Sequence, residues 1–161
     1  MVLVPEARYQ MGRKSCPMNS YEMAEDYLKR GGRCLGEAEE AFRDCDYPMA
    51  IRRSQECIEL CIKGILRAAS IEFPREHDVS DVLINTEWRG IGSPGWFVDR
   101  VESMAKIMRE ITPKRGPAMY GFEGEMKPAN AIFSVDDGIK ATTDARFVFE
   151  TCKKFFQEWR P

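Results

Sequence analysis

The sequence predicts an all-α protein, folded as an up-and-down bundle of about five helices. Apolar residues recur at the spacing of a helix face in several long segments. Turn signals rich in proline, glycine and aspartate separate these segments, and no segment alternates as an amphipathic β-strand does. The 161 residues are enough to bury one core. We therefore expect one helical-bundle domain over residues 20–161, after an N-terminal arm over residues 1–19 that shows no periodicity.

The first helix is predicted to run from about Ser20, a suitable N-cap, to Asp44. Its apolar and small residues recur with a helical period at Met23, Ala24, Tyr27, Leu28, Leu35, Ala38, Ala41 and Phe42. Gly31 and Gly32 interrupt the pattern, and each glycine costs about 1 kcal/mol of helix stability relative to alanine. We expect either a kink at these glycines or, as the simpler explanation, close packing of a neighbouring element.

The second helix follows a turn at Asp46-Tyr47-Pro48, with Pro48 suited to its first position. One apolar stripe runs along it through Ala50, Ile51, Ser54, Cys57, Ile58, Cys61, Ile62, Ile65, Leu66 and Ala69. The opposite face is charged and carries Arg52, Glu56, Glu59, Lys63 and Arg67. This pattern predicts a helix with one face in the core and the other in solvent.

A short third helix is predicted to begin over residues 77–83, with Asp78 or Ser80 as its cap. Ser93-Pro94 then opens a fourth helix, which ends at Thr112-Pro113.

Residues 113–130 contain three prolines and three glycines, a composition typical of a long loop without regular structure. Ser134 follows this segment, with Asp137 three residues on as the partner of a capping box. This pair predicts the start of the final helix of the bundle.

Charge and hydropathy restrict the classes of function. A net charge of −2 and an isoelectric point near 5.6 argue against the basic field of a protein that coats nucleic acid, so any such contact must be local. No apolar run approaches the roughly 20 residues of a membrane helix, and the first residues do not resemble a signal peptide. We expect a cytoplasmic protein without membrane contact, in which the six cysteines are reduced thiols.

Few residues are suited to catalysis or metal binding. Histidine occurs only once, as His77, and Cys57 and Cys61 have the helical spacing of core residues, so we expect no metal and no cofactor. His77 and Asp78 fit a capping or buried polar role better than a nucleophilic triad. The basic residues are the more suggestive set, because they could converge on a phosphate: Lys63, Arg67, Arg75 and Arg115.

The second helix also carries a motif. Gln55, Glu59 and Lys63 follow one another at four-residue spacing, and His77-Asp78-Val79 begins the next predicted helix. In this order the sequence resembles the HEPN family, the higher eukaryote and prokaryote nucleotide-binding domains, over about residues 20–160. The resemblance implies a helical bundle, usually a homodimer. It also implies one of two roles: a metal-independent, toxin-like ribonuclease, or a binding module beside a nucleotidyltransferase-like partner.

The ribonuclease members of that family have an arginine followed by a histidine four to six residues later. The corresponding arginine here is Arg115, and the residue five positions on is Tyr120. Tyrosine, with a pKa near 10, is a poor proton acceptor at neutral pH. The resemblance therefore implies that this chain binds its ligand without cleaving it, with Tyr120 either contacting a base or sugar or only closing the loop.

We accordingly predict a homodimeric module that binds a nucleotide or RNA and has no catalytic residue. The predicted ligand-binding residues are Gln55, Glu59, Lys63, Arg67, Arg75, His77, Asp78, Arg115 and Tyr120. One alternative is an endoribonuclease that pairs Arg115 with Tyr120 or with His77. The other alternative is a protein-interaction module, which predicts an apolar groove in place of a basic one.

Overall fold

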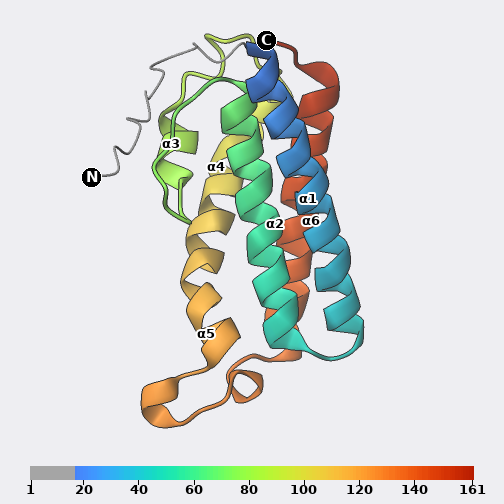
Figure 1. Ribbon diagram of the computed structural model, residues 1–161, viewed down its shortest axis with the longest axis vertical. Helices are drawn as coiled ribbons and strands as arrows, with labels where there is room; N and C mark the ends of the chain where they lie inside the picture. Colours follow the sequence, from blue (N-terminus) through green and yellow to red (C-terminus); the bar gives the residue numbers. More distant parts are fainter. Residues whose placement is uncertain (1–16) are drawn as a thin grey trace, which may run out of the picture.

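The computed structural model describes residues 17–161, which fold as a helical bundle (Figure 1). Its elements, in chain order, are α1 (Pro17–Arg43), α2 (Tyr47–Ala68), α3 (Ser80–Asn85), α4 (Gly95–Ile111), η1 (Thr112–Lys114), α5 (Arg115–Tyr120), η2 (Glu123–Glu125), η3 (Ala129–Ala131) and α6 (Val135–Glu158). Within these residues there is no β-strand, only an isolated bridge between Phe122 and Lys127. The predicted all-α fold class is confirmed. The predicted arm lies outside the described residues up to position 16, and α1 begins at Pro17.

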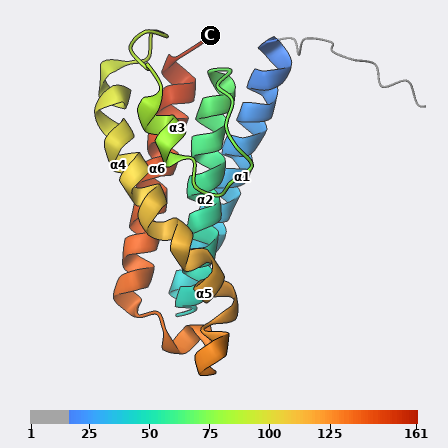
Figure 2. The ribbon, with the colours of Figure 1, turned by 90° about the vertical axis from the view of Figure 1, so that its left-hand side faces the viewer.

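The four long helices run up and down beside one another. In Figures 1 and 2, α1 descends, α2 returns, α4 descends on the other side of α2, and α6 climbs back behind α1 and α2. α3 lies against α4 near one end of the bundle, whereas α5 and residues 121–131 form the opposite end. α2 contacts α1, α4, α5 and α6. Polar side chains of α2 that do not face the core therefore lie close to residues of these neighbouring helices.

The core lies along the predicted apolar stripe of α2. Ile51, Ile58, Ile62, Ile65 and Leu66 are fully buried there. An aromatic cluster extends the core between α4 and α6 and consists of Trp88, Phe97, Phe155 and Trp159. None of the described helices combines the length and the apolar character that a membrane crossing requires.

Glycine brings α1 close to α2. α1 continues through Gly31 and Gly32 as one α-helix. A Cβ atom at Gly31 would lie 2.6 Å from the Sγ of Cys61, and one at Gly64 would lie 3.3 Å from the backbone oxygen of Ala24. The close packing that we predicted at Gly31 is therefore confirmed, and it sets the separation of the two helices that carry the candidate site.

The predicted starts of α2 and α6 are confirmed by their caps. The Asp46 side chain accepts a hydrogen bond from the backbone N–H of Met49 at 3.1 Å. At α6, Ser134 and Asp137 form the complete capping box. These side chains satisfy N–H groups that have no partner in the first turn of a helix.

Two local predictions differ from the structure. α3 begins at Ser80, later than the predicted start near His77, because Asp78 instead accepts from the backbone N–H of Ser80 in a turn before the helix. The prediction that residues 113–130 lack regular structure was also wrong, since the segment contains α5, η2 and parts of η1 and η3. Pro117 lies in the first turn of α5, where a missing N–H costs no intrahelical hydrogen bond.

Candidate functional site

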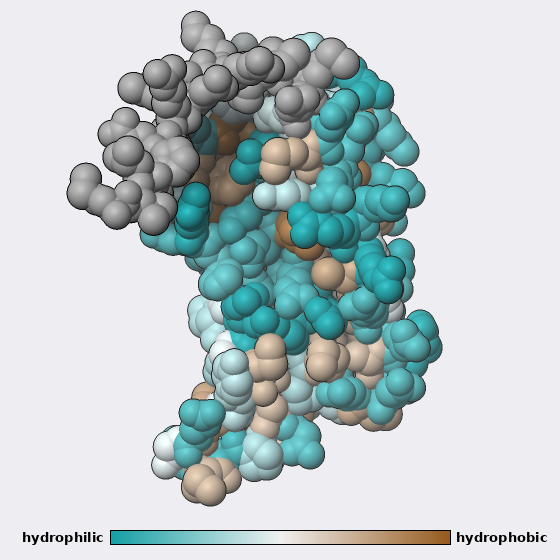
Figure 3. Space-filling view, viewed as in Figure 1, coloured by the Kyte–Doolittle hydropathy of each residue, from teal (hydrophilic) through white to brown (hydrophobic). Residues whose placement is uncertain are grey.

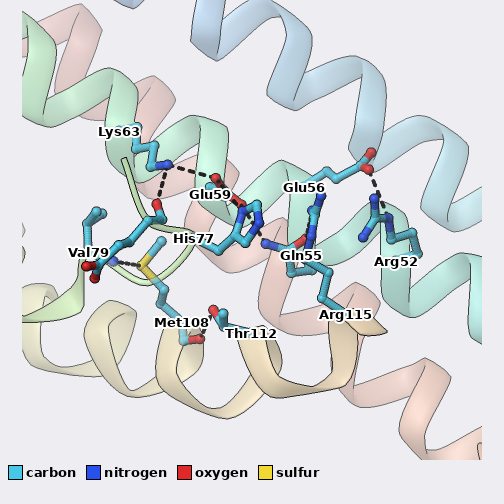
Figure 4. A network of polar contacts seen from close by, with 11 residues as sticks. Arg52, Gln55, Glu56, Glu59, Lys63, His77, Val79, Met108, Thr112 and Arg115 are labelled. Carbon is cyan, nitrogen blue, oxygen red and sulfur yellow. Dashed lines mark hydrogen bonds and ion pairs between the residues drawn. The ribbon is translucent and has the colours of Figure 1, made fainter. Parts of the chain in front are cut away.

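A row of polar side chains on α2 forms the centre of the candidate site (Figure 4). Gln55, Glu59 and Lys63 lie on consecutive turns because residues four apart share one face of a helix. The Gln55 amide donates to one carboxylate oxygen of Glu59 (Nε2 to Oε2, 2.7 Å), and the Lys63 ammonium donates to the other (Nζ to Oε1, 2.8 Å). Gln55 is buried, although amides are rare in cores, so its hydrogen bonds replace those it loses from water.

His77 reaches the same carboxylate from the connection between α2 and α3. Its Nδ1 lies 3.1 Å from Oε2 and 3.2 Å from Oε1 of Glu59. Lys63 also donates to the backbone oxygen of Glu76 at 2.5 Å and so fixes the chain beside His77. Because an ionised carboxylate only accepts hydrogen bonds, Nδ1 carries the proton, and Nε2 is the ring nitrogen left for another partner.

Arg115, the first residue of α5, enters the site from a distant part of the sequence. Its Nη1 donates to the Oε1 of Gln55 at 2.9 Å, across 60 positions of the chain. One hydrogen-bonded network therefore links Arg115 through Gln55 and Glu59 to Lys63 and His77, as Figure 4 shows.

Opposing effects act on the ionisation of Glu59. Burial by itself would raise the pKa of its carboxyl group, but the hydrogen bonds from Lys63, Gln55 and His77 and the charge of Lys63 outweigh it. The net result is a pKa below the usual 4.5, so Glu59 is ionised at neutral pH and its charge is compensated mainly by Lys63.

The network opens into a cleft of about 580 Å³ between α1 and α2, which we call the α1–α2 cleft. It is lined by Tyr27, Arg30, Arg33, Cys34, Glu37, Arg53, Glu56, Glu59, Leu60, Lys63, His77 and Arg115. Five of these side chains are cationic and three are anionic, in a chain whose net charge is −2. Figure 3 shows mainly hydrophilic side chains across the middle of the face that α1 and α2 form in Figure 1. The cleft is therefore locally basic on an acidic protein.

Most of these cations already have a carboxylate partner. Arg30 pairs with Asp26, Arg33 and Arg53 with Glu37, and Lys63 with Glu59, each at 3.2 Å or less. Arg115 differs, because its partner Gln55 is neutral and no carboxylate among residues 17–161 lies within ion-pair distance. Its charge is thus available to an anion that enters the cleft.

The sequence did not identify the part of the cleft that α1 contributes. Arg30 and Arg33 lie on α1 and Arg53 on α2, and all three face this space. The sequence places these arginines on the polar faces of two predicted helices. It does not show that the two polar faces lie next to each other in the fold.

The other predicted residues lie elsewhere. Arg67 and Arg75 line a second cavity near the end of α2. Asp78 caps the turn at Ser80. Tyr120 is 69% exposed and lines a separate hollow formed by α5 and residues 121–125. Of the nine predicted residues, the structure brings together Gln55, Glu59, Lys63, His77 and Arg115.

Neither candidate proton acceptor is hydrogen-bonded to Arg115 in the part of the chain that the structure describes. Among the described side chains, Arg115 donates to Gln55 and not to His77 or Tyr120. No group of three or more histidine, cysteine, aspartate or glutamate side chains in this part of the chain has an arrangement that would hold a metal ion. Cys57 and Cys61, the one helical cysteine pair that we considered, are both buried in the core.

Comparison with solved structures agrees with this fold. The structure of TT1696 from Thermus thermophilus superposes with a TM-score of 0.58 at 20% identity, covering 81% of this chain and 96% of that one. ST0689, described as an archaeal HEPN homologue, superposes with a TM-score of 0.52 at 27% identity, covering 83% and 97%.

Comparison of sequences gives the family. A protein of Methanocaldococcus jannaschii named "Putative toxin MJ1304" is 25% identical over 138 residues, which are 84% of this chain and 89% of that protein. The model of the HEPN domain family matches residues 24–155, most of the chain. That range contains α2, the network around Glu59, and Arg115. The chain therefore belongs to the HEPN domain family.

Proposed function

We propose that this protein is a non-catalytic HEPN module that binds a nucleotide or RNA, with a phosphate group in the α1–α2 cleft. The observation that carries the proposal is the position of Arg115 in the cleft, where its only side-chain partner among the described residues is the neutral Gln55. α5 brings this guanidinium onto the Gln55–Glu59 network and leaves its charge without a carboxylate among the described residues. A planar guanidinium held by a buried amide is preorganised to make paired hydrogen bonds to phosphate oxygens.

The surrounding side chains support an anionic ligand of the same kind. The basic excess of the cleft attracts phosphate, and Tyr27 and His77 are rings on which a base can stack. Lys63 is bonded to Glu59, so it supports the network and adds charge at longer range. The charged lining also favours a phosphate ligand over the alternative of a protein partner, for which an apolar groove is expected.

Calorimetry tests this proposal. The protein is titrated with ATP, GTP and a short single-stranded RNA at moderate salt, and each titration is repeated with Arg115→Ala and Lys63→Ala. Arg89→Ala is the matched control, because Arg89 is exposed and lines neither the cleft nor the second cavity. We expect saturable binding that Arg115→Ala weakens about tenfold or more and Arg89→Ala leaves unchanged. Absence of heat with every ligand would contradict the proposal and favour the protein-interaction module.

One observation favours the alternative of a ribonuclease. His77, the single histidine, lines the same cleft as Arg115 and is oriented by Glu59 in the way that a carboxylate orients a general base. The same RNA samples are therefore analysed for cleavage by electrophoresis. Intact RNA is the expected result, whereas cleavage that is lost in both His77→Ala and Arg115→Ala would establish the ribonuclease instead.

The assembly is part of the same proposal. Following the family resemblance, we expect a cytoplasmic homodimer that acts beside a nucleotidyltransferase-like protein. Light scattering coupled to size-exclusion chromatography measures the mass directly. A mass of about 18.5 kDa, that of one chain, at micromolar concentration would contradict the homodimer.

A further inference from the structure

A second polar cavity, which we call the Arg67 cavity, lies near the C-terminal end of α2. Its volume is about 780 Å³, and it is lined by Ser20, Arg67, Ser70, Ile71, Glu72, Phe73 and Arg75. Two of these side chains are cationic and one is anionic, so this cavity also carries an excess of positive charge. It is larger than the α1–α2 cleft and contains the two predicted ligand-binding arginines that the cleft lacks.

Arg67 has donors that the described residues do not use. Its guanidinium carbon lies 5.6 Å from the ring centre of Tyr27 and 5.5 Å from that of Phe73, and these contacts fix its position. Its Nε is buried without a hydrogen-bond partner among residues 17–161, and no carboxylate there forms an ion pair with it. Arg67 also lines the cavity, so a phosphate oxygen there meets a guanidinium charge that no carboxylate among residues 17–161 neutralises.

Two aromatic rings connect the Arg67 cavity to the α1–α2 cleft. Tyr27 lines the cleft and contacts Arg67 of the cavity, while Phe73 lines the cavity and lies 5.7 Å from Nζ of Lys63 of the cleft. The cleft and the cavity are therefore neighbours along α2. The rings of Tyr27 and Phe73 and the cations of Lys63 and Arg67 lie between them. Such a combination is typical of grooves that follow a single nucleic-acid strand.

The separation of the two sites determines the size of ligand that fits both. Gln55, which holds Arg115, and Arg67 lie twelve positions apart on α2, a rise of about 18 Å along the helix. The phosphates of a mononucleotide are contiguous and cannot occupy both sites. A strand carries one phosphate at every nucleotide link, so several nucleotides reach from one site to the other.

We propose that the ligand is a single oligonucleotide strand that runs along α2, with one phosphate at Arg115 and another at Arg67 and Arg75. This inference rests on the proposed function, because it extends the ligand from the α1–α2 cleft into the Arg67 cavity. It selects a strand over a mononucleotide within the ligand classes of that function.

Oligouridylates of one, two, four and eight nucleotides test the inference by calorimetry at constant salt. With the unchanged protein, the affinity rises about tenfold or more between the dinucleotide and the octanucleotide, because the second contact becomes intramolecular. Arg67→Gln, which keeps the aliphatic stem, and Arg75→Ala, a change at an exposed position, both abolish this rise with length. Arg115→Ala weakens binding at every length, and Arg89→Ala changes nothing.

The outcomes separate this inference from the proposed function. Arg67→Gln and Arg75→Ala could bind the octanucleotide as tightly as the unchanged protein while Arg115→Ala binds it more weakly. In that case the inference that a strand reaches the Arg67 cavity is wrong, and the proposed function stands. If no oligouridylate binds at any length while ATP or GTP binds, the inference of a strand is wrong and the proposed function stands; if none of these ligands binds, both are wrong. If an octamer of glutamate binds more tightly than the octanucleotide and depends on Arg67, the Arg67 cavity serves an acidic peptide and the strand is again wrong.

Discussion

Glu59 is the residue on which the candidate site depends. Its carboxylate accepts hydrogen bonds from Gln55, Lys63 and His77, three residues that come from two elements. Because its side chain is only 15% exposed, little water reaches the carboxylate to replace these partners. Its charge therefore holds the donors that surround the cleft in place.

Replacing that charge has a predictable cost. Glu59→Gln keeps the shape of the side chain but removes the ionised acceptor, so Lys63 and His77 lose charge-assisted hydrogen bonds. We expect the free energy of unfolding to fall by about 1–3 kcal/mol at pH 7, measured by urea denaturation. As a control, Glu102→Gln changes an exposed carboxylate of α4 that has no ion pair among residues 17–161, and we expect it to stay within about 0.5 kcal/mol. Equal stability of the two variants would contradict the role of Glu59.

The same carboxylate predicts a pH dependence. The pKa of Glu59 is lower in the folded chain than the ordinary 4.5, so the unfolded chain takes up its proton first as the pH falls. The contribution of Glu59 to stability is therefore complete above about pH 4.5 and is lost as the pH falls through the folded-state pKa. Urea denaturation from pH 6 to pH 3 should show a smaller loss of stability for Glu59→Gln than for the unchanged protein. Parallel curves would show that Glu59 is not paired.

Part of this network could be predicted from the sequence. The four-residue spacing of Gln55, Glu59 and Lys63 places them on one helix face, and the helix period is encoded locally. The contact of Arg115 with Gln55 could not be predicted, since it joins positions 60 apart through the packing of α5 on α2. Arg67 continues the same spacing, yet Tyr27 and Phe73 hold it at a different cavity.

At the scale of elements, the distance between α1 and α2 determines the shape of the cleft. Both helices were predicted from their apolar period, and the glycines of α1 indicated a close neighbour. α5 was missed because prolines and glycines are read as helix breakers, although a proline in the first turn breaks no hydrogen bond. A six-residue helix also presents too few turns for its period to be recognised.

Two glycines of α1 give opposite predictions for the same substitution. In Gly31→Ala the new Cβ would lie 2.6 Å from the Sγ of buried Cys61, so either this side chain or α1 must shift, and we expect a loss of about 1–3 kcal/mol. Gly36 is exposed on the same helix, and a Cβ there would have no neighbouring atom within 4 Å. Gly36→Ala should therefore raise the free energy of unfolding by about 0.5–1 kcal/mol through helix propensity. Thermal and urea denaturation measure both. A stabilising Gly31→Ala would show that the helices are further apart than described.

At the scale of the whole molecule, an anionic ligand must bind to a protein that is itself negatively charged. The net charge is −2, so attraction of an anion comes from the local cationic excess of the α1–α2 cleft and the Arg67 cavity and not from a general field. Composition alone predicted that any nucleic-acid contact is local. It could not predict where the contact lies, because the lining comes from α1, α2, α5 and the α2–α3 connection, which only the folded bundle brings together.

Salt dependence measures this local charge. We expect the affinity for a short RNA to fall linearly on logarithmic axes as the salt concentration rises, since each neutralised phosphate releases counterions. Arg115→Ala should reduce the slope by about one, and Arg89→Ala should leave it unchanged. An affinity independent of salt would show that contacts to the phosphates do not hold the RNA.

Chemical-shift mapping tests the central claim, phosphate binding at Arg115, most directly. The ¹⁵N-labelled protein is titrated with a short single-stranded RNA while its backbone amide, histidine ring and arginine side-chain signals are recorded. The account predicts that the largest shifts occur at Gln55, Glu59, Lys63, His77 and Arg115, and that Arg115→Ala abolishes them. Shifts confined to the hollow beside Tyr120, or an unchanged response in Arg115→Ala, would contradict it.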